Sequence, residues 1–192
     1  MLNIIISGAP GCGKGTQSAL IIEQYGLQHF STGDMLRKEI AEQTEMGREA
    51  ERYISKGNLV PDQMIIDIIT ATLKKTCDQC KGIILDGFPR TVEQGRSLEQ
   101  LMDGLGQPTV VMLDIQVPKR ELINRLLIRG ETSDRSDDNL ETIKKRLEVF
   151  EIKTAPVIEY YQSLNKYQAI DGLGTMEEVF ARIKQVIDTL KK

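Results

Sequence analysis

Residues 2–17 read LNIIISGAPGCGKGTQ, and this stretch decides the fold of the 192-residue chain. Its first part, Leu2–Ile6, is a short apolar run of the kind that forms a strand buried on both faces. The second part has the spacing of a phosphate-binding loop: Gly8, four further residues, and then Gly13 and Lys14. A strand, a glycine-rich loop and a helix in this order predict that backbone N–H groups and the helix N-terminus bind phosphate. Lys14 is expected to reach the terminal phosphates.

The end of this loop departs from the general pattern, which has Ser or Thr directly after the lysine. Here Gly15 follows Lys14, and Thr16 comes one position later. The pattern therefore predicts phosphate binding, whereas direct contact between Thr16 and magnesium stays open.

Three further apolar runs, each followed by a turn signal and a helical pattern, extend this unit into a sheet. They are Ile83–Leu85, Thr109–Ile115 and Tyr167–Ile170, and a fifth, shorter strand is expected at Gln28–Phe30. Strands that alternate with helices predict a parallel sheet with crossover helices on its faces. The predicted fold class is α/β, with a P-loop NTPase-type, five-stranded parallel sheet flanked by helices.

Helix starts and buried helix faces follow from caps and apolar spacing. Capping-box patterns begin at Ser31, Thr91 and Thr175. Two apolar stripes at helical spacing are predicted to face the core. They are Met176, Val179, Phe180, Ile183, Val186, Ile187 and Leu190 in the last helix, and Leu140, Ile143, Leu147 and Phe150 in an earlier one.

Composition limits the kinds of partner. The formal net charge is −3, from 25 basic and 28 acidic side chains, which argues against nucleic acid or an acidic membrane as a partner. No apolar run is long enough to span a membrane, and no signal-peptide pattern is present, so a cytoplasmic location is expected. Cys77 and Cys80 form a single CxxC. A zinc site takes about four ligands, so reduced thiols are favoured there over zinc or redox chemistry.

A second stretch with predicted chemistry is ILDGFPRT, residues 84–91. Asp86 ends a predicted strand beside the phosphate loop, where a carboxylate can hold magnesium through water. Arg90 follows after a short turn and could clamp a phosphate with its fork of donors. The alternative for Asp86 is an ordinary helix cap.

Scattered arginines and two poorly packed segments complete the pattern. Residues 31–61 and 129–138 are rich in charge and are interpreted as mobile flaps over a cleft, the alternative being plain surface excursions. The arginines without an obvious structural role are Arg37, Arg90, Arg125, Arg129, Arg135 and Arg146. Together they could neutralise a phosphate chain during transfer. An acceptor that is itself a phosphate needs no general base, so exclusion of water matters more.

These motifs together resemble the adenylate kinase family, the nucleoside monophosphate kinases that interconvert ATP plus AMP with two ADP. The resemblance covers essentially the whole chain. It rests on GAPGCGKGT (8–16), STGDMLR (31–37), GNLVPD (57–62), LDGFPRT (85–91), RGETSDRSDDN (129–139) and IKKRL (143–147). The Gly15-Thr16 ending is this family's form of the phosphate loop. The short lid lacks the insert that sometimes carries zinc cysteines, so no zinc is expected.

The resemblance implies a role for each matching residue. ATP would be bound by Gly11, Cys12, Gly13, Lys14, Gly15, Thr16, Arg125, Arg129 and Gly174. AMP would be bound by Thr32, Arg37, Asn58, Leu59, Val60, Gly87, Phe88, Pro89, Arg90, Gln94, Arg135 and Arg146. The catalytic residues would be Lys14, Arg90, Arg129, Arg135 and Arg146. Asp86 would orient the water shell of magnesium, which enters as Mg-ATP.

The resemblance also implies an organisation. A core of residues 1–30, 61–128 and 139–192 would carry an AMP-binding flap (31–60) and a short lid (129–138). The substrates would be ATP, AMP and ADP, and the chain is expected to be a monomer. One departure lies in the lid, where Asp134 stands in place of the family's usual Gly and Ser136 in place of a commonly apolar residue.

Three rival functions stay open at this point. A UMP/CMP kinase shares the phosphate loop and DGFPR but tends to have Ala in place of Thr32 and Asn in place of Thr91. A nucleotide-binding module without turnover would not need the acceptor contacts. An NTPase switch that uses water needs a base reader, and Gln168 stands where the Asp of an NKxD motif would be.

Overall fold

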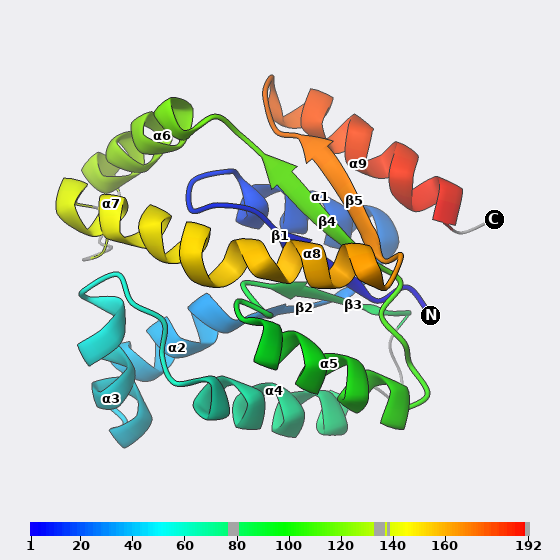
Figure 1. The fold of residues 1–192 in the computed structure, drawn as a ribbon, viewed down its shortest axis with the longest axis horizontal. Helices are drawn as coiled ribbons and strands as arrows, with labels where there is room; N and C mark the ends of the chain where they lie inside the picture. The colour runs from blue at the N-terminus through cyan, green and yellow to red at the C-terminus, as the bar shows by residue number, and fades with distance from the viewer. Residues whose placement is uncertain (77–80, 133–136, 138, 191–192) are drawn as a thin grey trace.

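The structure is a computed structural model that describes residues 1–76, 81–132, 137 and 139–190. A five-stranded sheet forms its centre, with helices on both faces (Figure 1). The strands are β1 (Ile4–Ser7), β2 (Gln28–Ser31), β3 (Ile83–Asp86), β4 (Val111–Gln116) and β5 (Tyr167–Asp171). Their spatial order is β2-β3-β1-β4-β5, and all neighbouring pairs are parallel. The predicted fold class is confirmed, and the predicted strands are all present.

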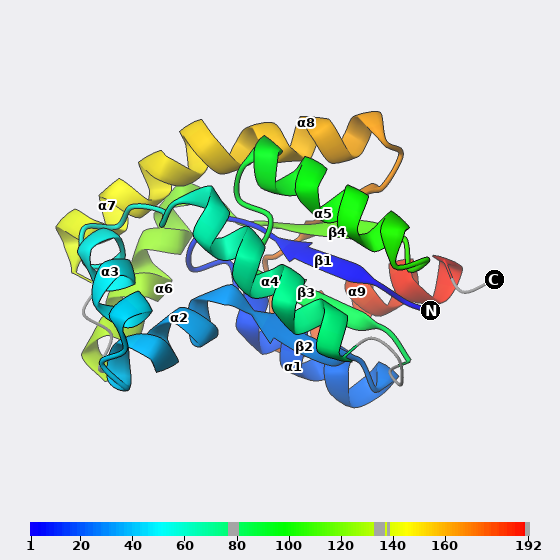
Figure 2. The ribbon, with the colours of Figure 1, turned by 90° about the horizontal axis from the view of Figure 1, so that it is seen from below.

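Helices cover the two faces of the sheet as two separate layers. The helices of the described residues are α1 (Lys14–Tyr25), α2 (Thr32–Ala41), α3 (Glu45–Ile54), α4 (Asp62–Thr76), α5 (Val92–Gly104), α6 (Lys119–Thr132), α7 (Leu140–Val149), α8 (Ala155–Ser163) and α9 (Met176–Leu190). Figure 2 shows α1 and α9 on one face of the sheet, with α5 and α8 on the other. In the part of the chain that the structure describes, no helix is long and apolar enough to cross a membrane.

The central strand shows why the opening apolar run is continuous. Ile4 and Ile6 of β1 point into the core beneath α1 and α9, whereas Ile5 points into the core beneath α4, α5 and α8. All three side chains are 1% exposed. A strand covered on both faces needs apolar side chains at every position rather than at every second one.

The connections leave a crevice at the carboxyl ends of β1 and β3. These strands are neighbours, with Ile6 paired to Asp86. However, α1 leaves β1 toward one face, and α5 follows β3 on the other. In parallel α/β sheets, ligands bind where successive connections diverge in this way. At the same end, α2 and α3 project on one side and α6 and α7 on the other (Figure 1).

A long helical rod crosses the molecule and changes its winding midway. Between α7 and α8 lies a π-helical segment, η1 (Phe150–Thr154), in which Ala155 N–H donates to the Phe150 carbonyl five residues back. Pro156 follows in the first turn of α8 and has no N–H to donate. Segments of this kind are often found at functional sites.

The predicted helix caps are present, whereas the predicted apolar stripes are only partly buried. The hydroxyl oxygens of Ser31, Thr91 and Thr175 each accept a bond from the backbone N–H three residues later. In the two stripes, Met176, Leu190 and Leu140 were predicted to face the core but are 54%, 44% and 46% exposed. Each lies at the first or last residue of its helix, where the stripe runs past the edge of the packed layer.

Candidate active site

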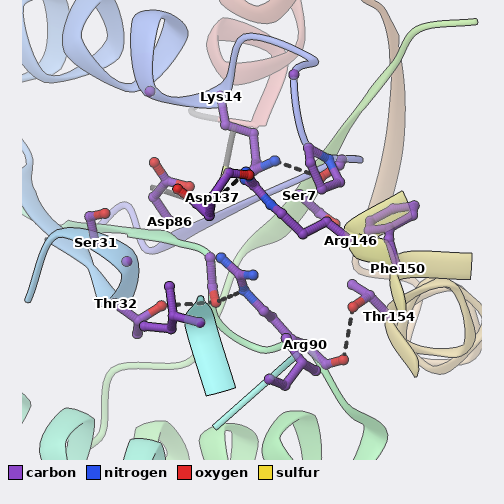
Figure 3. Close-up of a pocket in the computed structure, with 18 of the residues that line it drawn as sticks. Ser7, Lys14, Ser31, Thr32, Asp86, Arg90, Asp137, Arg146, Phe150 and Thr154 are labelled. Carbon is purple, nitrogen blue, oxygen red and sulfur yellow. Dashed lines mark hydrogen bonds and ion pairs between the residues drawn. The ribbon is translucent and has the colours of Figure 1, made fainter. Parts of the chain in front are cut away.

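One cavity of about 480 Å³ lies at the carboxyl ends of β1 and β3. It joins the phosphate loop to the turn that follows β3, and Figure 3 shows Lys14, Arg90 and Arg146 reaching into the same space. The predicted site residues that line it are Gly11, Gly13, Lys14, Gly15, Thr16, Thr32, Arg37, Asn58, Leu59, Val60, Asp86, Gly87, Pro89, Arg90, Gln94, Arg125, Arg129 and Arg146. Residues separated by up to 135 positions in the chain are thus brought together.

Among the described residues, three predicted site residues, Cys12, Phe88 and Gly174, do not line this cavity. Cys12 is 2% exposed beneath the loop, and Phe88 is 2% exposed in the core beneath α4, α5 and α8. Gly174 lies in the turn after β5. Arg135 lies outside the described residues, as do the lid residues Asp134 and Ser136 and the pair Cys77 and Cys80.

The phosphate loop adopts its shape because glycine occupies positions with unusual backbone angles. Gly13, which precedes α1, has φ of 96°, in the left-handed region that side chains disfavour. At Gly8, φ is 137°, and a Cβ would lie 2.6 Å from the Ile115 carbonyl oxygen. The loop can therefore curve tightly at the end of β1 and leave the N-terminus of α1 facing the cavity.

The Lys14 side chain folds back over the loop that carries it. Its Nζ donates to the carbonyl oxygens of Gly8, at 2.6 Å, and Ala9, at 3.2 Å. Both partners are neutral, so they do not cancel the positive charge of the ammonium group. A compact charge at this place can stabilise a phosphate oxygen inside the cavity.

Asp86 ends β3 beside the phosphate loop, as predicted. The residue is 9% exposed and lines the cavity, and its Oδ2 lies 3.8 Å from Nε2 of His29 on the neighbouring strand β2. In the described part of the chain, no group of three or more His, Cys, Asp or Glu side chains could hold a metal ion. Magnesium bound with a nucleotide commonly takes one or two carboxylates together with phosphates and water. Asp86 fits such a site.

Arg90 is held in place at the opposite end of the cavity. Its Nε donates to the Gly87 carbonyl at 2.7 Å, and that carbonyl also accepts from the Thr32 hydroxyl at 2.9 Å. The backbone N–H of Arg90 donates to Gln94 Oε1 at 2.7 Å, and its carbonyl accepts from the Thr154 hydroxyl at 3.0 Å. These contacts fix the backbone and Nε, so the rest of the guanidinium fork faces the cavity.

Positive charge is concentrated around Arg90. Burial, followed by the cation of Arg146 and partly offset by Asp86, lowers the pKa of Arg90 from its ordinary value. Arg146 itself donates to the Asp137 carboxylate at 2.8 Å. A half-buried group of cations that disfavour one another can attract a polyanion, even though Arg146 and Arg37 each also pair with an acidic side chain.

Comparison with known proteins identifies the family. Residues 6–166 match the family model described as adenylate kinase. The chain is 52% identical to the adenylate kinase of Parabacteroides distasonis over 191 residues, covering 100% of both proteins. It is 46% identical to that of Porphyromonas gingivalis over 192 residues, which is 98% of that protein. The chain belongs to the adenylate kinase family.

An adenylate kinase is a phosphotransferase, a nucleoside monophosphate kinase whose substrates are ATP, AMP and ADP, and the family uses magnesium nucleotides. The family assignment agrees with the resemblance found in the sequence motifs. It also agrees with Thr at positions 32 and 91, which favoured AMP over the pyrimidine monophosphates.

At one edge of this adenylate kinase site, the turn after β5 is tied to the phosphate-loop side. Gln17 of α1 donates to the Met176 carbonyl at 3.1 Å, and the Arg125 guanidinium lies 3.4 Å from the Gly172 carbonyl. Arg182 donates to the carbonyl of Leu173 at 2.6 Å. Gly174, although it does not line the cavity, therefore lies in a turn that is held against the phosphate-loop side of the molecule.

Some contacts at the site were not predicted from the sequence. The pairing of Arg146 with Asp137 had only a weak signal, an acidic residue in a polar segment next to predicted arginines. The bond from Thr154 to Arg90 spans 64 residues and has no local signal at all. Contacts of this kind depend on how distant elements pack, and a motif cannot contain them.

Proposed function

We propose that this chain catalyses the reversible, magnesium-dependent transfer of the terminal phosphoryl group from ATP to AMP, giving two ADP. The donor would bind at the phosphate-loop end of the cavity, around Lys14, and the acceptor at the end that contains Arg90. The observation that carries this proposal is that a single cavity contains both ends. A kinase for a phosphate acceptor needs its two phosphate chains in line in one water-poor space.

The acceptor end has the groups that hold a monophosphate. Arg90 presents a fork of donors that suits the geometry of phosphate oxygens. Arg37 and Arg146 line the same cavity, and Thr32 anchors the turn at Gly87. In the proposed reaction, an oxygen of the AMP phosphate attacks the terminal phosphorus of ATP, and the bond from that phosphorus to the bridging oxygen of the leaving ADP breaks. The attacking oxygen is already anionic, so the cations are needed for positioning and charge stabilisation rather than for proton removal.

At the donor end, the backbone N–H groups of residues 11–16 and the N-terminus of α1 would hold the ATP phosphates. Lys14 would leave its loop carbonyls for the transferred phosphoryl group. Arg125 and Arg129 would border the nucleotide, with Gly174 near the base. Asp86 would hold magnesium through water, and the ion, when bound, supplies charge neutralisation to the phosphate chain.

The proposed moving parts are the flap (31–60), which contains α2 and α3, and the lid (129–138), around the core of residues 1–30, 61–128 and 139–192. Closure of both would exclude water, which protects ATP from hydrolysis. Arg135 would act from the lid. A monomeric state, a cytoplasmic location and the absence of zinc stay predictions of the family resemblance.

The test is the turnover of purified protein with magnesium and ATP, offering AMP, UMP, CMP, GMP or water as the acceptor. We expect rapid ADP formation with AMP and slow turnover with every other acceptor. A preference for UMP or CMP would contradict the assignment of the acceptor base. ATP binding without transfer to any acceptor would contradict catalysis and favour a binding module.

A further inference from the structure

We propose that Asp62 is a positioning residue that determines base specificity at the acceptor site by fixing the orientation of the Gln94 side-chain amide. This inference rests on the proposed function, in which Gln94 faces the base of the acceptor nucleotide. Asp62 is the first residue of α4, directly after the proposed flap. Its carboxylate lies behind Gln94 and does not itself line the cavity.

Both oxygens of the Asp62 carboxylate have partners on the first turn of α5 or its cap. Oδ1 accepts from Gln94 Nε2 at 2.8 Å, and Oδ2 accepts from the Thr91 hydroxyl at 2.8 Å. The Thr91 oxygen in turn accepts from the Gln94 backbone N–H at 3.2 Å. The three residues therefore form a closed network, and the carboxylate cannot turn away from Gln94 without losing a second bond.

Gln94 can adopt only one of its two amide orientations in this network. Its Oε1 accepts from the Arg90 backbone N–H at 2.7 Å, while Nε2 donates to Asp62. A carboxylate only accepts hydrogen bonds and a backbone N–H only donates them. Rotation of the amide by 180° would set oxygen against carboxylate and N–H against N–H. Because Gln94 is 2% exposed, water cannot compensate for the two lost bonds.

A fixed amide can distinguish two purines that differ at position 6. The adenine edge presents an acceptor at N1 and a donor at the 6-amino group. A 6-oxopurine, such as hypoxanthine or guanine, presents a donor and an acceptor in the same places. One N–H of Gln94 Nε2 is taken by Asp62, which leaves its second N–H and a lone pair of Oε1 for the base. An amide that could rotate would suit both bases, whereas a locked amide suits one.

The experiment compares AMP with IMP, which differ only at the N1 and C6 positions of the base. Asp62→Asn keeps the shape of the side chain but lets it donate as well as accept, which removes one of the two barriers to amide rotation. We expect the ratio of kcat/KM for AMP to kcat/KM for IMP to fall by about 10-fold. The KM for ATP is expected to stay within about 2-fold, since Asp62 lies away from the phosphate loop.

Asp67→Asn is the matched control. Asp67 lies on the same helix, and its carboxylate also accepts from a glutamine amide, Gln63 Nε2, at 2.7 Å, but the pair is exposed. This variant should leave the AMP to IMP ratio unchanged. If Asp62→Asn does not fold, Asp62→Ala provides the same test, since it removes the carboxylate that opposes rotation of the Gln94 amide.

The outcomes separate this inference from the proposed function. A wild-type protein that forms no ADP from ATP and AMP overturns the proposed function and the inference with it. A wild-type protein that uses AMP and IMP equally well overturns only the inference. A wild-type protein that prefers AMP, together with an Asp62→Asn ratio equal to that of wild type, overturns only the inference. An equal loss of kcat/KM for both acceptors shows a structural role for Asp62 and overturns the inference as well.

Discussion

The two ends of the cavity hold their functional groups in different ways. At the acceptor end, Arg90 is fixed by contacts from α5 and η1, through Gln94 and Thr154. The Gly87 carbonyl to which Arg90 donates is itself held by Thr32 of α2. At the donor end, Lys14 contacts only carbonyls of its own loop among its main-chain partners in the described structure. The acceptor end is therefore oriented by distant parts of the chain, and the donor end by a single continuous stretch. The acceptor site is therefore preorganised before the nucleotide binds, whereas donor binding requires Lys14 to break its bonds to the loop carbonyls.

The largest effect is expected for Lys14→Met, which removes the donor-end cation while keeping a side chain of similar length. The rate of transfer at saturating ATP and AMP should fall by about 10²–10³-fold, since a charge that stabilises the transition state is lost. The melting temperature should change little, because Lys14 bonds only to its own loop. The measurement is kcat by ADP formation, with thermal unfolding as the control. Turnover near that of wild type would remove Lys14 from the mechanism.

Arg90→Lys tests the acceptor end. The change keeps the charge but removes the bond from Nε to Gly87 and the fork that suits a phosphate. We expect kcat/KM for AMP to fall by about 10- to 100-fold, with a much smaller change in KM for ATP. Steady-state kinetics with each substrate varied in turn separates the two. An equal fall in kcat/KM for AMP and for ATP would show that Arg90 does not act at the acceptor end alone.

A smaller effect is expected for Thr154→Val, which removes the hydroxyl that donates to the Arg90 carbonyl while keeping the shape of the side chain. Loss of one hydrogen bond of this type costs about 0.5–1.5 kcal/mol, so kcat/KM for AMP should fall by about 2- to 10-fold. Thr154→Ser keeps the hydroxyl and should retain most of the wild-type kcat/KM for AMP. If both variants behave alike, the hydroxyl does not help to position Arg90.

The smallest effect is expected at Tyr167, which does not line the cavity and should affect stability rather than turnover. Burial and then the Asp114 carboxylate, which accepts from the tyrosine hydroxyl at 3.1 Å, raise the pKa of Tyr167 to about 12. A raised pKa in the folded state favours the neutral phenol, so this contribution is present below about pH 10, the ordinary tyrosine value. It is lost as pH rises toward 12.

Tyr167→Phe should therefore flatten the fall in the free energy of unfolding between about pH 10 and 12, as measured by urea unfolding at a series of pH values. Turnover at neutral pH should not change. An unaltered alkaline slope would show that Tyr167 does not titrate as a buried phenol.

The sequence predicted the donor end of the cavity better than the acceptor end. The donor end and the central strand were predictable, because residues 2–17 contain the strand, the loop and the helix start in order. The edge strand β2 has a single apolar residue, Phe30, so its sequence predicted only a short strand there. The capping box from Thr91 to Gln94 was predicted, but the contacts that Asp62 adds to it were not, because Asp62 and Gln94 are 32 residues apart and no local pattern joins them. Leu140 and Met176, which lie at the ends of the two apolar stripes, were wrongly assigned to the core. Apolar spacing alone does not show where a packed layer ends.

The π-helical turn at Phe150–Thr154 has a consequence for how chains of this kind can change in length. A turn closed by a bond between residues five apart contains one residue more than an α-helical turn. Deleting one residue there would therefore let the rod close into a regular α-helix and leave α8 nearly in its present orientation, so Tyr161, which is 0% exposed, would keep its place in the core. The hydroxyl of Thr154 lies in the altered turn, and its bond to Arg90 is what such a deletion would put at risk. This turn is thus a place where the rod can lose a residue without losing the packing of α8, at the expense of a contact to Arg90.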